Sequence, residues 1–272
     1  MTLLKKLFLS FSFFFCVLPA GLHAATAFDY SSWDAFLKKN VNEKGEVDYR
    51  SIKNDPKELN DFIESLTQAG GSDMKAWPRE EVLAFWLNAY QASMMKLIVE
   101  HYPVASVQKI PGFWDLTAFR IGKILKRQKQ FSLNDIRVRC LISVYRDEKI
   151  HLALSMAAKS GPVLMAEAFT GPKVEGQLFL LTRKFVADPR CVDVVPGRKK
   201  IMLSRIFKWY ADDFKLDFGT LESRGKLSAG ENAVVSFLAY YLEDEAKDEY
   251  LQEAQYKIDY LPFDWELNDW KR

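Results

Sequence analysis

The chain has 272 residues, of which 49% are hydrophobic, and its formal net charge is +2. This proportion of apolar residues allows a substantial core. A chain so close to neutral has no global field to attract nucleic acid or an anionic lipid surface, so we expect neither as a partner.

Residues 1–24 have the features of a secretory signal peptide. Lys5 and Lys6 form a positive segment, residues 7–18 form a short apolar segment, and Ala24 is a small residue suited to cleavage. An uncleaved anchor is the alternative, although the apolar segment is short for a bilayer span. We therefore predict an exported, soluble protein, periplasmic or secreted, with no stable membrane insertion after cleavage and a single domain over residues 25–272.

The first half of the chain is predicted to be mainly helical. Residues 32–39 carry apolar side chains at helical spacing, and Asp55 followed by Pro56 is typical of the start of a second helix. Pro78 opens a third helix, which Pro103 ends. Because this third helix is apolar over most of its circumference, we expect it to be the central, buried helix.

The second half is predicted to mix helices with short strands. The expected elements are a hairpin near residues 119–131, a helix from Ser132, a weak strand at 150–154, a hairpin of 191–195 with 200–203, helices after Ser204 and Ser228, and a strand at 256–260. The predicted fold class is α+β: a helix-rich single domain with small strand and hairpin elements around the central helix.

Two amides interrupt the most apolar predicted helix. Asn88 and Gln91 are three residues apart and therefore share a face. A buried amide left without a hydrogen bond costs about 1–3 kcal/mol, so both require partners. One interpretation is that they line a pocket and orient a ligand or a catalytic side chain. The other is that they hydrogen-bond a loop and lock the core.

The segment from His151 to Gly171 is the most informative for function, because its residues predict that it forms the wall of a pocket. His151 has apolar neighbours, and an imidazole titrates near neutrality, which suits general acid–base chemistry. Ser155 and Ser160 are candidate nucleophiles, each of which needs a base and an oxyanion hole. The alternatives are a hydrogen-bonded core histidine and two turn or cap hydroxyls.

The C-terminal segment is rich in aromatic residues and also carries polar side chains. Asp264 and Asn268 alternate there with large rings, which predicts a segment that packs back on the core and lines a cleft. Simple docking of the C-terminus is the alternative interpretation.

Two cysteines remain after removal of the leader, Cys140 and Cys191. In an oxidising compartment they can form a disulfide; two separately buried thiols are the alternative. Two thiols and so few histidines cannot build a closed zinc site, and the acidic segment 43–48 lacks the spacing of a calcium loop. We therefore expect no metal and no cofactor.

Several short blocks, taken in order, resemble one family. They are Phe-Trp-Leu-Asn-Ala-Tyr-Gln-Ala at 85–92, Tyr-Pro-Val at 102–104, Phe-Ser-Leu-Asn-Asp-Ile at 131–136, His-Leu-Ala-Leu at 151–154, Ala-Phe-Thr-Gly at 168–171, Leu-Ser-Arg-Ile-Phe-Lys-Trp-Tyr at 203–210 and Phe-Asp-Trp-Glu-Leu-Asn at 263–268. From about residue 47 to residue 268 the chain resembles an exported, bacterial-type member of the family catalogued as domain of unknown function 547.

The chain departs from the family's pattern at two positions where the family usually has a cysteine. The family usually reads His-Phe-Ala-Leu-Asn-Cys and then Ser-Cys-Pro, which implies a thiol hydrolase or transferase. Here Met156 and Gly161 stand at those places. A thioether cannot become a thiolate, and glycine has no nucleophile. The resemblance therefore implies a member that lacks the family's usual thiols, and this favours loss of catalysis.

Three functions are compatible with these residues. The first is a non-catalytic exported protein that binds a small molecule, peptide, glycan or envelope protein in the retained cleft. The second is a hydrolase or transferase that uses His151 with Ser155 or Ser160, or with Asp264 on a water. The third is a structural protein of the envelope. Fold resemblance alone does not choose among them.

Overall fold

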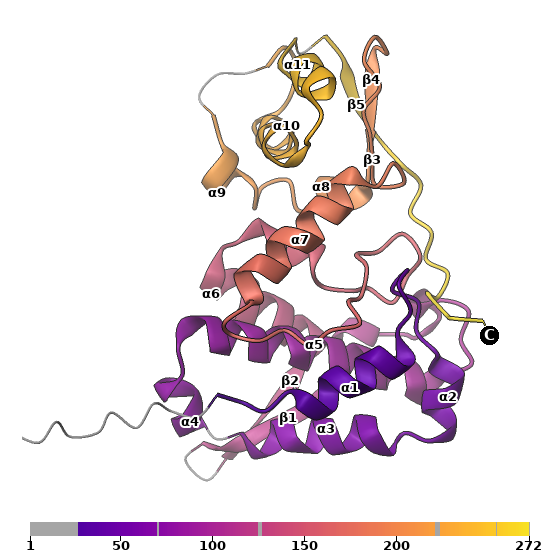
Figure 1. Cartoon of the computed structure of the whole chain (residues 1–272), viewed down its shortest axis with the longest axis vertical. Coiled ribbons are helices and arrows are strands. Elements are labelled where there is room, and N and C mark those ends of the chain that lie inside the picture. Colours follow the sequence, from indigo (N-terminus) through magenta and orange to yellow (C-terminus); the bar gives the residue numbers. More distant parts are fainter. Residues whose placement is uncertain (1–26, 70, 125–126, 221–223, 254, 272) are drawn as a thin grey trace, which may run out of the picture.

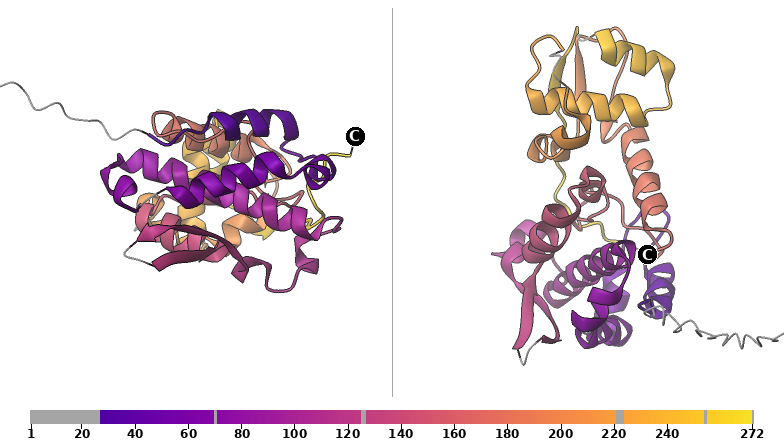
Figure 2. Two further views of the ribbon diagram at one scale, coloured as in Figure 1. Left: turned by 90° about the horizontal axis from the view of Figure 1, so that it is seen from below. Right: turned by 90° about the vertical axis from the view of Figure 1, so that its left-hand side faces the viewer.

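The computed structural model describes residues 27–69, 71–124, 127–220, 224–253 and 255–271. The expected signal peptide, residues 1–24, lies outside this part. The fold is helix-rich α+β, as predicted, and Figures 1 and 2 show that its elements gather into two lobes.

The first lobe is built largely from the first half of the chain (Figure 1). Its elements are α1 (Ser31–Asn40), α2 (Tyr49–Asn54), α3 (Lys57–Gln68), α4 (Gly71–Ala76), α5 (Arg79–His101), the 3-10 turns η1 (Val107–Lys109) and η2 (Phe113–Asp115), the strands β1 (Thr117–Ile124) and β2 (Arg127–Ser132), the π-helix η3 (Asp135–Ile142), α6 (Ser143–Tyr145) and the 3-10 turn η4 (Glu148–Leu152). Strands β1 and β2 pair antiparallel, which confirms the hairpin predicted there.

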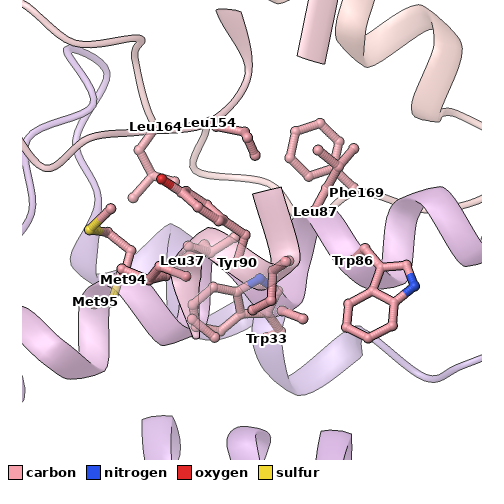
Figure 3. Packing of buried hydrophobic residues seen from close by; sticks show 14 of the residues in the cluster. Trp33, Leu37, Trp86, Leu87, Tyr90, Met94, Met95, Leu154, Leu164 and Phe169 are labelled. Carbon is pink, nitrogen blue, oxygen red and sulfur yellow. The ribbon is translucent and has the colours of Figure 1, made fainter. Parts of the chain in front are cut away.

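Helix α5 is the central helix of the first lobe, as its sequence indicates. It starts after Pro78 and ends before Pro103. It is the one helix in the described ranges that is long and apolar enough to cross a membrane, but 89% of its most apolar window is buried inside the protein. Figure 3 shows this packing around Trp86, Leu87 and Tyr90. Buried neighbours on all sides account for the missing polar face.

The second lobe follows α7 (Val174–Ala187), which runs between the two lobes (Figure 2). Its elements are β3 (Val192–Asp193), β4 (Lys200–Leu203), α8 (Arg205–Trp209), α9 (Lys215–Phe218), α10 (Ala229–Tyr241), α11 (Glu245–Glu253) and β5 (Lys257–Tyr260). The sheet has the order β3-β4-β5, with β3 antiparallel and β5 parallel to β4. Helix α10 begins with the predicted capping box of Ser228 and Glu231.

Each lobe has its own cluster of buried apolar residues. In the first, Trp33 is fully buried and stacks on Phe62 with ring centroids 4.6 Å apart. In the second, Phe207, Phe214 and Phe237 pack on one another. Residues 152, 156 and 158 belong to the second cluster, whereas Leu154 belongs to the first, so this short run is where the clusters meet.

The C-terminal segment ties the lobes together. After β5 it leaves the second lobe and runs along the first, where Figure 1 shows the chain ending. Bridges join Glu266 to Ser106, Leu267 to Ala158 and Asp269 to Val47. This confirms the prediction that the segment packs back on the core.

One predicted element is wrong. Residues 150–154, expected as a strand, form the end of η4 and the turn after it. The Asp147 side chain accepts a hydrogen bond from the Lys149 backbone N–H at 2.9 Å and caps this turn. A local cap of this kind outweighs a weak alternation of apolar residues.

Candidate functional site

The His151 side chain is held by a carboxylate and a ring. Its Nε2 lies 2.8 Å from Oδ2 of Asp213, in the turn that follows α8. Its ring stacks on Tyr210, with centroids 3.9 Å apart and planes 7° apart. Only 2% of the residue is exposed. The structure therefore pairs His151 with Asp213 in place of the serines or Asp264 expected from the sequence.

The charge states of this pair follow from burial and from their contact. Burial lowers the pKa of His151, and the hydrogen bond from Asp213 opposes this effect. The hydrogen bond with His151 lowers the pKa of Asp213. An ionised carboxylate only accepts hydrogen bonds, so Nε2 carries the imidazole hydrogen and Nδ1 keeps its lone pair. A neutral imidazole oriented in this way has the form of a general base.

His151 lies in the wall of a cavity of about 380 Å³ at the junction of the two lobes, here called the aromatic hollow. Its lining residues are Tyr90, Trp114, Asp115, Asn134, Arg137, His151, Leu154, Met156, Trp209, Tyr210 and Trp265. Trp114 and Trp265 each pack against the buried clusters of both lobes. Its walls therefore depend on how the lobes meet.

A polar edge of the aromatic hollow is organised by Arg137 on η3. Its Nη2 donates to Oδ1 of Asn134 at 3.0 Å, and its Nη1 donates to the hydroxyl of Tyr210 at 3.4 Å. The guanidinium also lies over the Tyr210 ring, 5.6 Å from the centroid. These contacts hold the side chain in one orientation before any ligand arrives.

Met156, one of the two positions at which the resemblance leads us to expect a cysteine, lines the aromatic hollow, and Gly161, the other, lies beside it. A Cβ built on Gly161 would be 3.3 Å from the Cβ of Met156 and 3.1 Å from the carbonyl oxygen of Ala158. Cβ atoms joined by a disulfide are usually about 3.5–4.5 Å apart. Two cysteines at these positions would therefore be placed to cross-link after a shift of a few tenths of an ångström.

A second cavity, of about 310 Å³, is lined by Ser160, Asp264 and Asn268 among the predicted polar site residues and is here called the charged hollow. Among its lining residues are Lys44, Glu46, Lys159, Ser160, Gly161, Lys184, Asp188, Arg190, Cys191, Asp264 and Asn268. Oγ of Ser160 accepts a hydrogen bond from the Asp264 backbone N–H at 2.9 Å. Asn268 accepts from the Tyr49 hydroxyl and donates to the Gly45 carbonyl. These three predicted residues come together, but away from His151.

The remaining predicted polar residues hold loops in place. Asn88 exchanges two hydrogen bonds with the backbone of Phe169, at 2.8 and 3.0 Å. Gln91 donates to the Ala153 carbonyl at 2.8 Å. Oγ of Ser155 accepts from the Ala157 backbone N–H at 3.2 Å. Asn88 and Gln91 therefore lock loops to α5, which is the second of the two interpretations considered for them.

The disulfide considered for Cys140 and Cys191 is not formed, since both residues are thiols. Cys140 packs against the buried cluster of the first lobe, and Cys191 lies in that of the second. Burial raises the pKa of Cys191 to about 12, so its thiol stays protonated near neutrality. Neither cysteine lines the aromatic hollow.

An acidic cavity of about 380 Å³ adjoins the other side of His151. Its lining residues are Ile142, Ser143, Arg146, Asp147, Glu148, His151, Asp212, Asp213 and Leu216. Glu148 is 2% exposed, and its Oε2 makes no hydrogen bond in the structure. Burial raises the pKa of Glu148 to about 7. In the described ranges, no group of three His, Cys, Asp or Glu side chains is arranged to hold a metal ion.

Several residues of this site could not be predicted from the sequence. Asp213, Arg137 and Trp114 come from three separate elements, and none lies in a motif with a fixed spacing to His151. Trp209 and Tyr210 are inside one of the blocks that resemble the family, which is the signal that could have drawn attention to them.

The family model described as "Protein of unknown function, DUF547" matches residues 74–186. This range covers α5, the β1–β2 hairpin, η4 and α7, and thus His151 and the first-lobe wall of the aromatic hollow. No curated protein and no solved structure matches the chain. The segment 74–186 of the chain therefore belongs to this family of unknown function.

Proposed function

We propose that this protein binds a small ligand in the aromatic hollow and does not transform it. The observation that carries the proposal is the lining itself: five aromatic rings, with Arg137 and His151 already held by hydrogen bonds. Ligand sites are typically concave and mostly apolar, with a few placed polar groups. Preorganised polar groups reduce the entropy lost on binding.

The lack of a hydroxyl, thiol or amine nucleophile of the Ser, Thr, Cys or Lys type in the described lining supports the proposal that the protein does not transform its ligand. The residues that line the aromatic hollow, all within the described ranges, include no serine, threonine, cysteine or lysine. Ser155 is used in a turn, and Ser160 lines the charged hollow. Met156, whose thioether is not a nucleophile, lines the same hollow as His151.

Export belongs to the same proposal and is supported by residues 1–24, whose charged and apolar segments are typical of a secretory signal. Fractionation of cells that express the full chain tests it. A processed protein outside the cytoplasm is expected, and an unprocessed cytoplasmic or membrane-bound chain would contradict it.

Ligand binding is tested by screening a metabolite library for a rise in melting temperature, because a ligand of the native state raises apparent stability. Hits are then measured by calorimetry with two variants. Trp209→Ala removes a ring from the aromatic hollow, while Tyr240→Ala removes an exposed ring elsewhere. Loss of affinity in the first variant only is expected. A library without hits, or hits that both variants bind equally, would refute the proposal.

A second candidate is a hydrolase or transferase in which His151 is a general base for a bound water. The 2.8 Å contact between Nε2 and Asp213 favours it, because such a contact orients a catalytic imidazole. Turnover of a library hit, abolished by both His151→Ala and Asp213→Ala, would establish this function. If the ligand is chemically unchanged after prolonged incubation, the enzymatic function is excluded for that ligand and the binding function stands.

A further inference from the structure

We infer that the ligand of the aromatic hollow is an uncharged saccharide whose pyranose ring stacks on the tryptophans. This inference rests on the proposed binding function and specifies its ligand. The inference is supported by three tryptophans and three polar side chains that line the hollow, and by the near-neutral total charge of that lining.

The tryptophans provide an open stacking surface. Trp209 is 41% exposed although it is among the largest apolar side chains. Its ring is held in place by neighbouring rings: it stacks on Trp265 with centroids 5.7 Å apart, and its centroid lies 5.0 Å from that of Phe263. Trp114, on η2, lines the same hollow. The face of an indole is negative, and one face of a pyranose presents a set of weakly positive C–H groups, so the two surfaces are complementary.

The polar edge suits hydroxyl groups. Asp115 is exposed and offers carboxylate acceptors, Arg137 offers guanidinium donors, and Asn134 offers both kinds of group. A sugar hydroxyl donates and accepts at once, so neighbouring hydroxyls can use all three. A site built around hydrogen bonds of this kind discriminates strongly against ligands that lack them.

The charge of the lining favours a neutral ligand. Asp115 contributes one negative charge and Arg137 one positive charge. His151 donates to Asp213, whose carboxylate faces the neighbouring acidic cavity. An aromatic cage for a quaternary ammonium ion is disfavoured, because Arg137 already lies over the Tyr210 ring and would repel a second cation. For a ligand anion, attraction to Arg137 would be offset by repulsion from Asp115.

The experiment titrates the processed protein with cellotriose, maltotriose and N,N′,N″-triacetylchitotriose, and follows tryptophan fluorescence and calorimetric heat. Choline, glucuronic acid and uridine monophosphate serve as charged comparison ligands. Saturable binding of at least one neutral trisaccharide, tighter than that of every charged ligand, is expected. Trp209→Ala is expected to weaken it by tenfold or more, and Asp115→Ala by about tenfold, as for a lost charge-assisted hydrogen bond. Tyr240→Ala should bind as the wild type does.

Two outcomes would overturn the inference. If a charged ligand binds more tightly and Trp209→Ala abolishes that binding, the hollow is a ligand site but the saccharide assignment is wrong. If a trisaccharide binds with equal affinity to Trp209→Ala and Asp115→Ala, the sugar is held elsewhere on the protein. Failure of every ligand in the broader metabolite screen would instead refute the proposed function itself. Trp209→Ala and Asp115→Ala both change exposed side chains, so both variants are expected to fold, and an unchanged circular dichroism spectrum verifies this.

Discussion

The aromatic hollow and the charged hollow differ in chemistry, yet one run of chain lines both. His151, Leu154 and Met156 face the first, whereas residues 158–163 face the second. Between them Ala157 has φ of 52°, in the left-handed region that non-glycine residues rarely adopt. Leu152, which precedes this turn, also lines the charged hollow, so residues close in sequence belong to different cavities on both sides of it. Candidate catalytic residues within one motif therefore do not necessarily share a site.

The largest expected effect comes from two adjacent residues that face different hollows. Trp265 lines the aromatic hollow and packs on both buried clusters, whereas Asp264 is exposed in the charged hollow. We expect Trp265→Ala to lower the free energy of unfolding by about 3 kcal/mol and Asp264→Ala by about 0.5 kcal/mol. Denaturant unfolding measures both. Equal losses would show that the lobes do not depend on the aromatic junction.

The second test joins Met156, which lines the aromatic hollow, to Gly161, which lines the charged hollow. We expect the double variant Met156→Cys with Gly161→Cys to form a disulfide, because the Cβ atoms nearly reach bonding distance. The closed loop is short, so the stabilisation is about 1–2 kcal/mol and disappears with reductant. Thiol titration and melting with and without reductant measure it. Two titratable thiols in the oxidised protein would show that the positions do not fit a cross-link.

The third test varies pH to probe Glu148, which lines the acidic cavity next to His151. Burial raises the pKa of Glu148 to about 7 in the folded protein, from 4.5. The folded state therefore binds more protons than the unfolded state between these values, and the contribution of Glu148 to stability falls as pH rises from 4.5 to 7. We expect Glu148→Gln to raise the free energy of unfolding at pH 8 by about 1–2 kcal/mol, with little change at pH 4.5. A constant difference at both pH values would contradict this.

The smallest expected effect lies in the charged hollow. Ser160→Ala removes the hydroxyl that accepts from the Asp264 backbone N–H, at a cost of about 1 kcal/mol. The ligand affinity of the aromatic hollow should not change, because Ser160 is not among its lining residues. Calorimetry with any library hit provides the measurement. A large loss of affinity would show that the two hollows form one site.

Much of the fold could be predicted because its signals are local. Proline marked both ends of α5, and Ser228 with Glu231 marked the start of α10. The strand predicted at 150–154 failed because a side-chain cap at Asp147 stabilises a 3-10 turn there. The site was harder, because Asp213 and Arg137 reach His151 only through the packing of distant elements.

The sequence by itself determined the helix-rich α+β class, the central apolar helix and the resemblance to the family. These follow from periodicity, capping and motif order, which depend on neighbours along the chain. Only the tertiary structure decided that Asp213 holds His151, that Met156 and Gly161 lie side by side, and that Ser160 belongs to another cavity. These depend on how two apolar clusters pack, because contacts between distant residues are set by burial in three dimensions and not by spacing.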